Sequence, residues 1–354
     1  MTVRSPTLSV AVIGDRFMKP GFFVDALDRL DGVELNIRTL ELDWPDAPMI
    51  HGYGDDVPEQ LRGLKEYLGD PDQIVEFIDD ADILITHLAP VSGAMLDRLP
   101  NLKLIAVSRG GPVNIDMAAA RARNIPVVNA PGRNASAVAE FTVGMILAET
   151  RLITRGHSSL SQGIWRGDLY RADVTGDELC NMTVGVIGYG QIGTRLVRLL
   201  KPFGCRIVVC DPYVELNPQD AADGVEQIEL NELLRTADVV TLHARVTDET
   251  TGFIGAEQFA MMKDGVYFIN TARGPLVDYD ALYQALVSGR IRGAGIETFS
   301  VEPVPPDWPL LKLDNVTLTP HIAGASLQTV KYAAVQVGEE VSRFLNSEPL
   351  INRC

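Results

Sequence analysis

The chain has 354 residues, of which 46% are hydrophobic and 22% are charged, and its formal net charge is −16. This length is sufficient for two domains with separate cores, and the composition is that of a globular protein rather than a disordered one. A negative charge of this size repels nucleic acid and anionic membrane surfaces, so we expect neither as a partner. Any anionic ligand must then be held by local positive groups.

The cysteines and the N-terminus point to the reducing interior of the cell. Cys180, Cys205, Cys210 and Cys354 lack the C-x-x-C spacing of metal sites, and two of them flank an expected buried strand. The first residues show no signal-peptide pattern, and no window of the sequence approaches a membrane span. We therefore expect a soluble cytoplasmic protein with no metal centre.

Strand-like and helix-like segments alternate through the first third of the chain. Apolar runs predict strands at 8–14, 81–89, 102–108 and 125–131, and helical patterns lie between them at 21–30, 71–80 and 115–124. This β-α-β order implies a parallel sheet. Residues 41–60, rich in Asp, Pro and Gly, are expected to form a long surface excursion.

A second series of the same kind begins after a long apolar segment, residues 141–163, that we expect to be one unbroken connecting helix. The predicted strands of this series lie at 183–188, 206–211, 237–244, 265–272, 291–298 and 315–321. A last amphipathic helix is predicted over 326–346, and we expect it to pack back on the first domain. The predicted fold is therefore α/β, with two doubly wound parallel sheets.

The most specific motif is VGVIGYGQIG, in which Gly188, Gly190 and Gly193 form a G-x-G-x-x-G pattern between a strand and a helix. Such glycines permit a tight turn, a close approach of the backbone to a pyrophosphate and close packing of the helix. Asp211 ends the next strand, where a carboxylate accepts hydrogen bonds from the adenosine ribose. A 2′-phosphate would be repelled there, so we expect NAD rather than NADP as the cofactor.

Polar residues follow three later strands or lie between them. Arg273 stands in a small-residue loop after one strand, and its charged, forked guanidinium suits a carboxylate. His321 ends another strand and is the usual type of proton donor near neutral pH. Glu302, in the loop between them, is placed to orient His321, although residue type alone favours a solvated carboxylate.

His87 and Arg109 follow strands of the first domain, so we expect them to face the substrate. His51, in the acidic excursion, and His157, in the long helix, are expected to be structural or exposed to solvent.

The chain resembles the D-isomer-specific 2-hydroxyacid dehydrogenases, the family that includes phosphoglycerate dehydrogenase. The resemblance rests on NAPGRNASAVAEFT, VGVIGYGQIG, INTARGPLVDYDAL, GAGIETFSVEP and LTPHIAG, which occur in family order and spacing. It implies a Rossmann NAD-binding domain at 130–322 and a flavodoxin-like substrate domain made of 1–129 and 323–354. It also implies a homodimer that associates through the connecting helix.

The resemblance implies a role for each site residue. Arg273 would bind and polarise the 2-oxo acid, His321 would donate or accept the proton, and Glu302 would orient His321. Further cofactor contacts would come from Gln191, Ile192, His243, Thr250, Thr271, Ala272, Glu297 and Gly324. Substrate contacts would come from the first domain at His87, Arg109, Gly110 and Gly111.

Some positions depart from the family pattern. Glu297 replaces the usual Asp, and Arg245 replaces a common Pro near the ribose. Arg109 stands where a small residue is usual, and we expect it to select an anionic or polyhydroxy substrate. The loop at Thr86–Ala89 lacks the arginine of phosphoglycerate-type members.

The expected activity is an NAD-dependent dehydrogenase of 2-hydroxy acids, phosphoglycerate dehydrogenase-like. Reduction of hydroxypyruvate or glyoxylate, or oxidation of a sugar acid, is the alternative within enzymes. An NAD(H)-sensing binding protein, similar to the corepressors of this family, is the alternative of another class.

Overall fold

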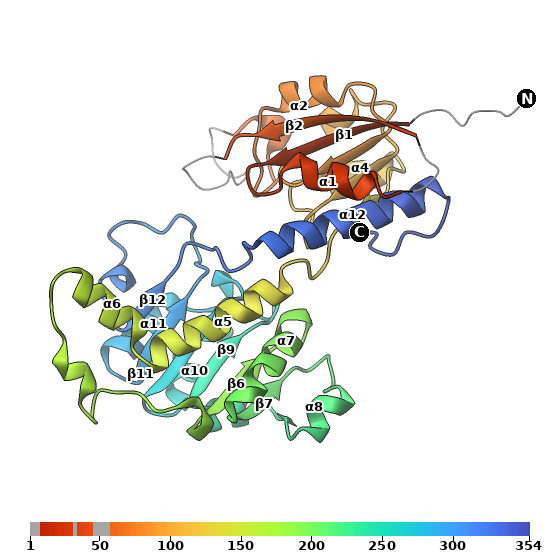
Figure 1. Ribbon diagram of the computed structural model, residues 1–354. Coiled ribbons are helices and arrows are strands. Elements are labelled where there is room, and N and C mark those ends of the chain that lie inside the picture. Colours follow the sequence, from red (N-terminus) through yellow and green to blue (C-terminus); the bar gives the residue numbers. More distant parts are fainter. Residues whose placement is uncertain (1–7, 31–33, 45–56) are drawn as a thin grey trace, which may run out of the picture. The chain divides into compact units, whose positions relative to one another are not determined.

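The chain divides into two compact units in the computed structural model, which describes residues 8–30, 34–44 and 57–354. Unit 1 comprises residues 1–133 and 325–354, and unit 2 comprises residues 134–324 (Figure 1). The acidic excursion and His51 lie largely or wholly outside the described residues.

Unit 1 is built on a five-stranded parallel sheet with the order β2-β1-β3-β4-β5. This is the flavodoxin-like order 2-1-3-4-5. The central strands are buried on both faces, as their continuous apolar sequences predict. The strands are β1 (Leu8–Asp15), β2 (Leu35–Leu42), β3 (Ile83–Thr86), β4 (Leu104–Val107) and β5 (Val127–Val128).

Helices cover the sheet of unit 1, and most of them begin at a capping side chain. Asp70, Ser92 and Asp116 each accept hydrogen bonds from backbone N–H groups in the first turn of the helix that follows. The helices are α1 (Pro20–Leu27), α2 (Pro71–Ile78), α3 (Gly93–Leu96), α4 (Met117–Ala122) and α12 (Leu327–Leu345), with a 3₁₀ turn, η1, at Glu59–Leu61.

The last helix, α12, belongs to unit 1 although unit 2 precedes it in sequence. It runs beside α1 (Figure 1), and a Cβ on Gly338 would lie 3.2 Å from the Cβ of Ala26. Its apolar face enters the same core as β1 and β3, with Val330, Ala333, Val337 and Val341 all buried. The C-terminal segment completes the unit, because Cys354 N–H bonds to the carbonyl of Val127 beside β5.

Unit 2 contains a seven-stranded parallel sheet with the order β12-β11-β10-β9-β6-β7-β8. Counted from β6, this is the Rossmann order 3-2-1-4-5-6 with one further strand beyond β11. The prediction of two parallel-sheet α/β domains is therefore confirmed. The strands are β6 (Thr183–Ile187), β7 (Arg206–Cys210), β8 (Glu226–Gln227), β9 (Val239–Leu242), β10 (Val266–Asn270), β11 (Ile291–Ile296) and β12 (Val316–Leu318).

Two apolar clusters of unit 2 lie on opposite faces of this sheet, and helices close each of them. The helices are α5 (Ala135–Thr150), α6 (Ile153–Ser161), α7 (Gln191–Leu200), α8 (Pro218–Ala222), α9 (Leu230–Thr236), α10 (Ala256–Met261) and α11 (Tyr279–Val287). Short 3₁₀ turns occur at η2 (Gly167–Tyr170), η3 (Leu179–Asn181), η4 (Lys201–Phe203), η5 (Gly274–Leu276) and η6 (Pro309–Lys312).

The prediction of one unbroken helix over 141–163 is wrong, because α5 ends at Thr150 and α6 begins at Ile153. Leu152 between them has φ +56°, in the left-handed region. The backbone of Gly176 packs against the carbonyl oxygen of Thr150, so closely that a Cβ there would lie 1.8 Å from it. The next turn of α5 has no room in that direction, and the chain turns into a second helix.

The edge strand β2 was not predicted, because none of its eight residues is fully buried and three of them are exposed. It pairs with β1 along all eight residues. Within the described residues, no helix is both long enough and apolar enough to span a membrane.

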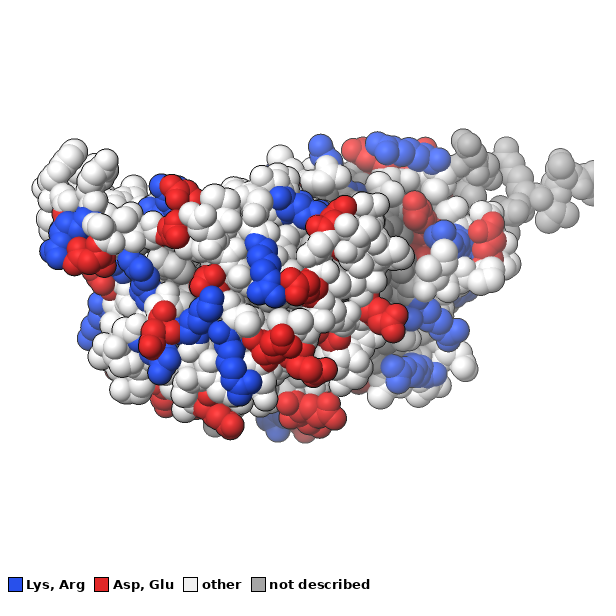
Figure 2. Space-filling model, turned by 90° about the horizontal axis from the view of Figure 1, so that it is seen from below, with Lys and Arg blue, Asp and Glu red and all other residues white. Residues whose placement is uncertain are grey.

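The surface charges are mixed rather than segregated. Figure 2 shows acidic and basic side chains interspersed over the face that it presents. Ion pairs such as Arg206–Glu226 and Lys201–Asp223 join neighbouring charges of opposite sign.

Candidate active site

The loop after β6 has the backbone that a dinucleotide requires. Gly188 has φ +99°, and a Cβ there would lie 2.6 Å from the carbonyl carbon of His243. A Cβ on Gly193 would lie 2.1 Å from the carbonyl oxygen of Gly188, so α7 packs directly on the loop. Gly190, in contrast, has nothing within 4 Å of its Cβ position, which leaves its backbone open to a ligand.

The N-terminus of α7 begins at this loop, with Gly190 as its N-cap and Gln191 and Ile192 in its first turn. The free N–H groups and the positive end of the helix dipole suit a pyrophosphate. No side chain caps this end, so the first-turn donors are left for a ligand. The residues present therefore fit the phosphates of NAD.

Asp211 follows β7, the strand next to β6, and its carboxylate is held by backbone donors. One oxygen accepts the N–H of Tyr189 at 2.7 Å, and the other accepts the N–H groups of Tyr213 and Val214. A carboxylate has about four acceptor positions, so one is left for a ribose hydroxyl.

His243 follows β9 and carries a buried polar atom without a partner. Its Nε2 lies 3.0 Å from the hydroxyl of Thr241, whereas its Nδ1 is buried with no hydrogen bond. Burial lowers the pKa of His243 to about 3, so the ring is neutral. A buried nitrogen without a hydrogen-bond partner beside the glycine loop is expected where a bound ligand supplies that partner.

The other predicted cofactor residues have protein contacts of their own. Thr250 closes a turn by donating its hydroxyl to the carbonyl of Arg245 at 2.6 Å. Thr271 shares a buried hydrogen bond of 2.8 Å with Thr142. Gly324 lies so close to Asn134 that a Cβ would come within 2.7 Å of its amide nitrogen.

Glu297 is fully buried at the end of β11 and holds the loop that carries His321. Its carboxylate accepts a hydrogen bond from the Thr319 hydroxyl and another, of 2.5 Å, from the N–H of Ala323. Burial raises the pKa of Glu297, and the two hydrogen bonds only partly offset that effect. The contacts of this side chain within unit 2 are thus with the His321 loop.

Arg273 is positioned by the loop after β10. Asn270 fixes this loop, because its side chain accepts the N–H of Ala272 and donates to the carbonyl of Arg273. Gly274 packs against the backbone of Phe299, where a Cβ would lie only 1.9 Å from the carbonyl carbon. The Arg273 loop therefore lies directly against the segment that leads to Glu302.

Glu302 and His321 form a hydrogen-bonded pair. Glu302 Oε1 accepts the N–H of Phe299 at 2.9 Å, and Oε2 lies 2.8 Å from Nδ1 of His321. Burial raises the pKa of Glu302, but the hydrogen bond and charge of His321, with help from Arg273, bring it below its ordinary value. Glu302 is thus a carboxylate that fixes the tautomer of His321 and leaves Nε2 for a ligand.

The structure therefore brings Arg273, Glu302 and His321 together within unit 2. Burial lowers the pKa of Arg273, and the nearby charge of Glu302 opposes that effect. An arginine keeps its charge in proteins, so the set contains a fixed cation, a fixed anion and a titratable ring. Such a set of side chains can bind a carboxylate and transfer one proton.

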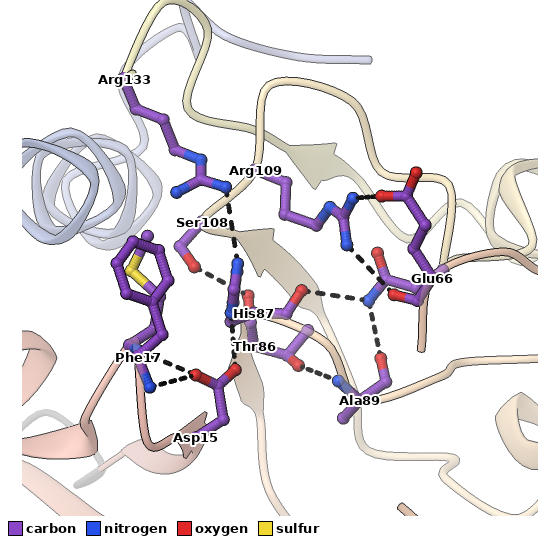
Figure 3. A network of polar contacts seen from close by, with 11 residues as sticks. Asp15, Phe17, Glu66, Thr86, His87, Ala89, Ser108, Arg109 and Arg133 are labelled. Carbon is purple, nitrogen blue, oxygen red and sulfur yellow. Dashed lines mark hydrogen bonds and ion pairs between the residues drawn. The ribbon is translucent and has the colours of Figure 1, made fainter. Parts of the chain in front are cut away.

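Unit 1 has a second polar cluster, at the carboxyl ends of its strands (Figure 3). His87, directly after β3, bonds through Nδ1 to Asp15 at the end of β1, with a distance of 2.6 Å. Arg133, after β5, reaches the other ring nitrogen of His87 at 3.5 Å. We did not predict roles for Asp15, which ends β1, or for Arg133, which lies in the turn between β5 and α5.

The remaining predicted substrate residues lie near this cluster in unit 1. Arg109 forms an ion pair with Glu66 and donates to the carbonyl of the same residue at 3.1 Å (Figure 3). Gly110 and Gly111 follow Arg109 and are exposed, with open space at both Cβ positions.

Comparison with known proteins gives a consistent set of matches. Residues 143–323 match the family model described as "D-isomer specific 2-hydroxyacid dehydrogenase, NAD binding domain". The D-3-phosphoglycerate dehydrogenase of Methanocaldococcus jannaschii is 40% identical over 281 residues, which are 78% of this chain and 52% of that relative. This chain therefore spans about half the length of that relative.

Two further matches cover more of the compared protein. The glyoxylate reductase of Korarchaeum cryptofilum is 37% identical over 276 residues, or 78% of this chain and 83% of that relative. The solved structure of a D-2-hydroxyisocaproate dehydrogenase superposes with a TM-score of 0.79 at 25% identity, covering 98% of this chain and 99% of that one.

Proposed function

Because the chain belongs to the D-isomer specific 2-hydroxyacid dehydrogenase family and has its NAD-binding domain, we propose that it is an NAD-dependent oxidoreductase acting on the CH–OH group of a 2-hydroxy acid. The observation that carries the proposal is the set of Arg273, Glu302 and His321 within one unit. NAD(H) supplies or accepts the hydride at C2 of the substrate.

Arg273 binds the substrate carboxylate and stabilises the negative charge that develops on the C2 oxygen during reduction. Its guanidinium suits this role because it is forked and partly desolvated, which strengthens its interaction with an anion. Asn270 and Gly274 keep the loop in place, so little reorganisation is needed when the substrate binds.

His321 gives its proton to the C2 oxygen in reduction and takes it back in oxidation. Glu302 holds the proton on Nδ1, and its negative charge stabilises the imidazolium form. Glu297 holds the loop of His321 from the opposite side through Thr319 and Ala323.

The substrate is a small 2-oxo or 2-hydroxy acid, and the relatives differ in which one they use. We favour a phosphoglycerate dehydrogenase-like activity, with reduction of hydroxypyruvate or glyoxylate, or oxidation of a sugar acid, as the alternatives. His87, Arg109, Gly110 and Gly111 are the proposed contacts from unit 1. Arg109 is already paired with Glu66, so part of its charge is balanced before a substrate arrives.

The test is consumption of NADH and NADPH by the purified protein with glyoxylate, hydroxypyruvate, phosphohydroxypyruvate and longer sugar-derived 2-oxo acids. We expect turnover that prefers NADH and is lost in His321→Ala. A variant at the surface residue Arg123, Arg123→Gln, is the control and should keep the wild-type rate. Tight NADH binding without turnover on any acid would contradict an enzymatic role and favour NAD(H) sensing.

We also propose that the protein is a homodimer that associates through α6 and the segment after it. This part of unit 2 exposes a group of large apolar side chains: Ile153, Leu160, Ile164, Trp165 and Tyr170. Such a patch on a globular protein is typical of an interface. Light scattering should give a dimer for the wild type and a monomer for Leu160→Asp with Trp165→Asp, and a monomeric wild type would exclude the proposal.

A further inference from the structure

Arg133 has an incomplete set of partners at the carboxyl edge of the unit 1 sheet. Its Nη2 lies 3.5 Å from Nε2 of His87, and its Nη1 is buried with no hydrogen bond. None of the carboxylates that the structure describes forms an ion pair with it. A guanidinium has five N–H donors, and burying them without acceptors is unfavourable.

Arg109 is an arginine at the same edge whose acceptors come from the chain itself. Its guanidinium contacts both the carboxylate and the backbone carbonyl of Glu66. Arg133 lies on the same edge of the sheet without such an internal anion (Figure 3). The difference indicates that the acceptors for Arg133 come from outside the chain.

Asp15 and His87 keep Arg133 oriented toward that ligand. Asp15 Oδ1 accepts the N–H groups of Phe17 and Met18, and Oδ2 accepts the Nδ1 proton of His87. The lone pair on Nε2 therefore faces the guanidinium of Arg133. The side chains of His87 and Asp15 are 4% and 0% exposed, so this geometry is held by packing on all sides.

The charges of the set favour an anionic ligand. Burial lowers the pKa of His87 by more than Asp15 raises it, so the ring is neutral and adds no charge. Burial also lowers the pKa of Arg133, to about 10, which leaves it charged at neutral pH. Asp15 balances this charge from a distance and forms no ion pair with the guanidinium, whose Nη1 has no hydrogen-bond acceptor.

We propose that Arg133, held by His87 and Asp15, binds a second oxyanion of the substrate, a carboxylate or a phosphate ester remote from the reacting carbon. The inference rests on the proposed function, in which Arg273 already takes the carboxylate next to C2. The ring of Phe17 packs beside His87, with the two ring centroids 5.9 Å apart. The substrate class is therefore 2-oxo acids that carry a second negative group.

Kinetics with matched substrate pairs test this assignment. Phosphohydroxypyruvate differs from hydroxypyruvate by the phosphate, and 2-oxoglutarate differs from 2-oxovalerate by the second carboxylate. Arg133→Gln should raise KM about 10- to 100-fold for the doubly charged member of one pair, as expected for the loss of a charged hydrogen bond, and less than about threefold for its partner. The pair that responds identifies the oxyanion as phosphate or carboxylate.

Equal changes for both members of each pair, or no change in either, would overturn the inference. Arg123→Gln is the control for loss of a positive charge, since Arg123 is a surface residue of the same unit paired with Asp97. If Arg133→Gln does not fold, Arg133→Lys keeps the charge and removes the forked guanidinium. The KM of the doubly charged substrate should again rise more than that of its partner, but by a smaller factor.

A binding measurement keeps this inference separate from the proposed enzymatic activity. The chain has five histidines, so ¹⁵N-histidine labelling gives few ring signals, and His87→Gln assigns the one of interest. Inorganic phosphate should shift the His87 signals in the wild type and in Arg123→Gln, but not in Arg133→Gln. Phosphate that shifts His87 equally in Arg133→Gln contradicts the site even if the enzyme is active, and absence of turnover on every acid leaves this readout intact.

Discussion

Among the residues that the structure describes, two histidine–carboxylate pairs have the same bonding and different burial. In unit 2, Nδ1 of His321 lies 2.8 Å from Glu302, and the two side chains are 37% and 28% exposed. In unit 1, Nδ1 of His87 lies 2.6 Å from Asp15, and the two side chains are 4% and 0% exposed. An imidazole must be reached by a substrate to exchange a proton, so the first pair suits proton transfer and the second suits fixed orientation.

The comparison shows that a histidine and a carboxylate within hydrogen-bond distance do not define a function by themselves. What differs is the environment of the second ring nitrogen. In His87 it faces Arg133, whereas the structure records no hydrogen bond for Nε2 of His321 within unit 2. The following measurements compare buried and partly exposed ionisable groups of the two units, from the largest expected effect to the smallest.

Glu302→Gln should lower kcat by about 100-fold or more, because an amide neither stabilises the imidazolium of His321 nor fixes the right tautomer. The free energy of unfolding should change by less than about 1 kcal/mol, since the pair is partly exposed. Stopped-flow kinetics and urea unfolding measure the two quantities. A wild-type kcat would remove Glu302 from the mechanism.

Asp15→Asn, unlike Glu302→Gln, should affect stability more than activity. The free energy of unfolding should fall by about 2–4 kcal/mol, and kcat for glyoxylate should change by less than tenfold. The substitution leaves His87 and Arg133 buried without their carboxylate. Urea unfolding of this variant beside Asp80→Asn, an exposed carboxylate of the same unit, measures the difference. Equal stability of the two variants would show that the buried pair is not structural.

Glu149→Gln should stabilise the protein at pH 8 by about 1–3 kcal/mol and have little effect near pH 4.5. Burial raises the pKa of Glu149 from 4.5 to about 7, with the Thr317 hydroxyl only partly opposing it. Its folded pKa lies above the unfolded value, so stability is complete below pH 4.5 and is lost as the pH rises through 7. Thermal unfolding of both proteins across this range gives the result, and a constant difference would refute the linkage.

The pKa of the His87 ring should lie below its ordinary value, because burial lowers it and Arg133 adds to that effect. The proton of His321 is used in one direction of the reaction and must be absent in the other. Reduction and oxidation should therefore have opposite pH trends. NMR of the labelled rings and kcat/KM in both directions measure these effects; identical pH profiles for reduction and oxidation would exclude His321 as the proton carrier.

Much of the fold could be predicted because its strands are continuous apolar runs, such as 8–14 and 183–188, with the glycine motif directly after the second. The edge strand β2 escaped prediction because solvent covers one side of it and its sequence is not uniformly apolar. The break at Leu152 depends on the approach of Gly176, which lies 24 residues further along the chain and is not visible from local periodicity.

The candidate site likewise has a part that could be predicted from local sequence and a part that could not. The motifs around Arg273 and His321 are local, so their neighbourhood could be inferred from strand ends alone. Asp15 and His87 are separated by 72 residues, and their hydrogen bond depends on β1 and β3 being adjacent in the sheet. Arg109 follows the end of β4 by two residues, whereas Arg133 follows the end of β5 by five, so strand-end position was a weaker signal for Arg133.

The return of α12 to unit 1 also sets an order of events during synthesis. All residues of unit 2 have been synthesised by residue 324, whereas the core of unit 1 lacks Val330, Val337 and Val341 until the last helix is made. Protease treatment of stalled nascent chains would show which unit is protected first. The unit that begins the chain is therefore the second whose sequence is completed.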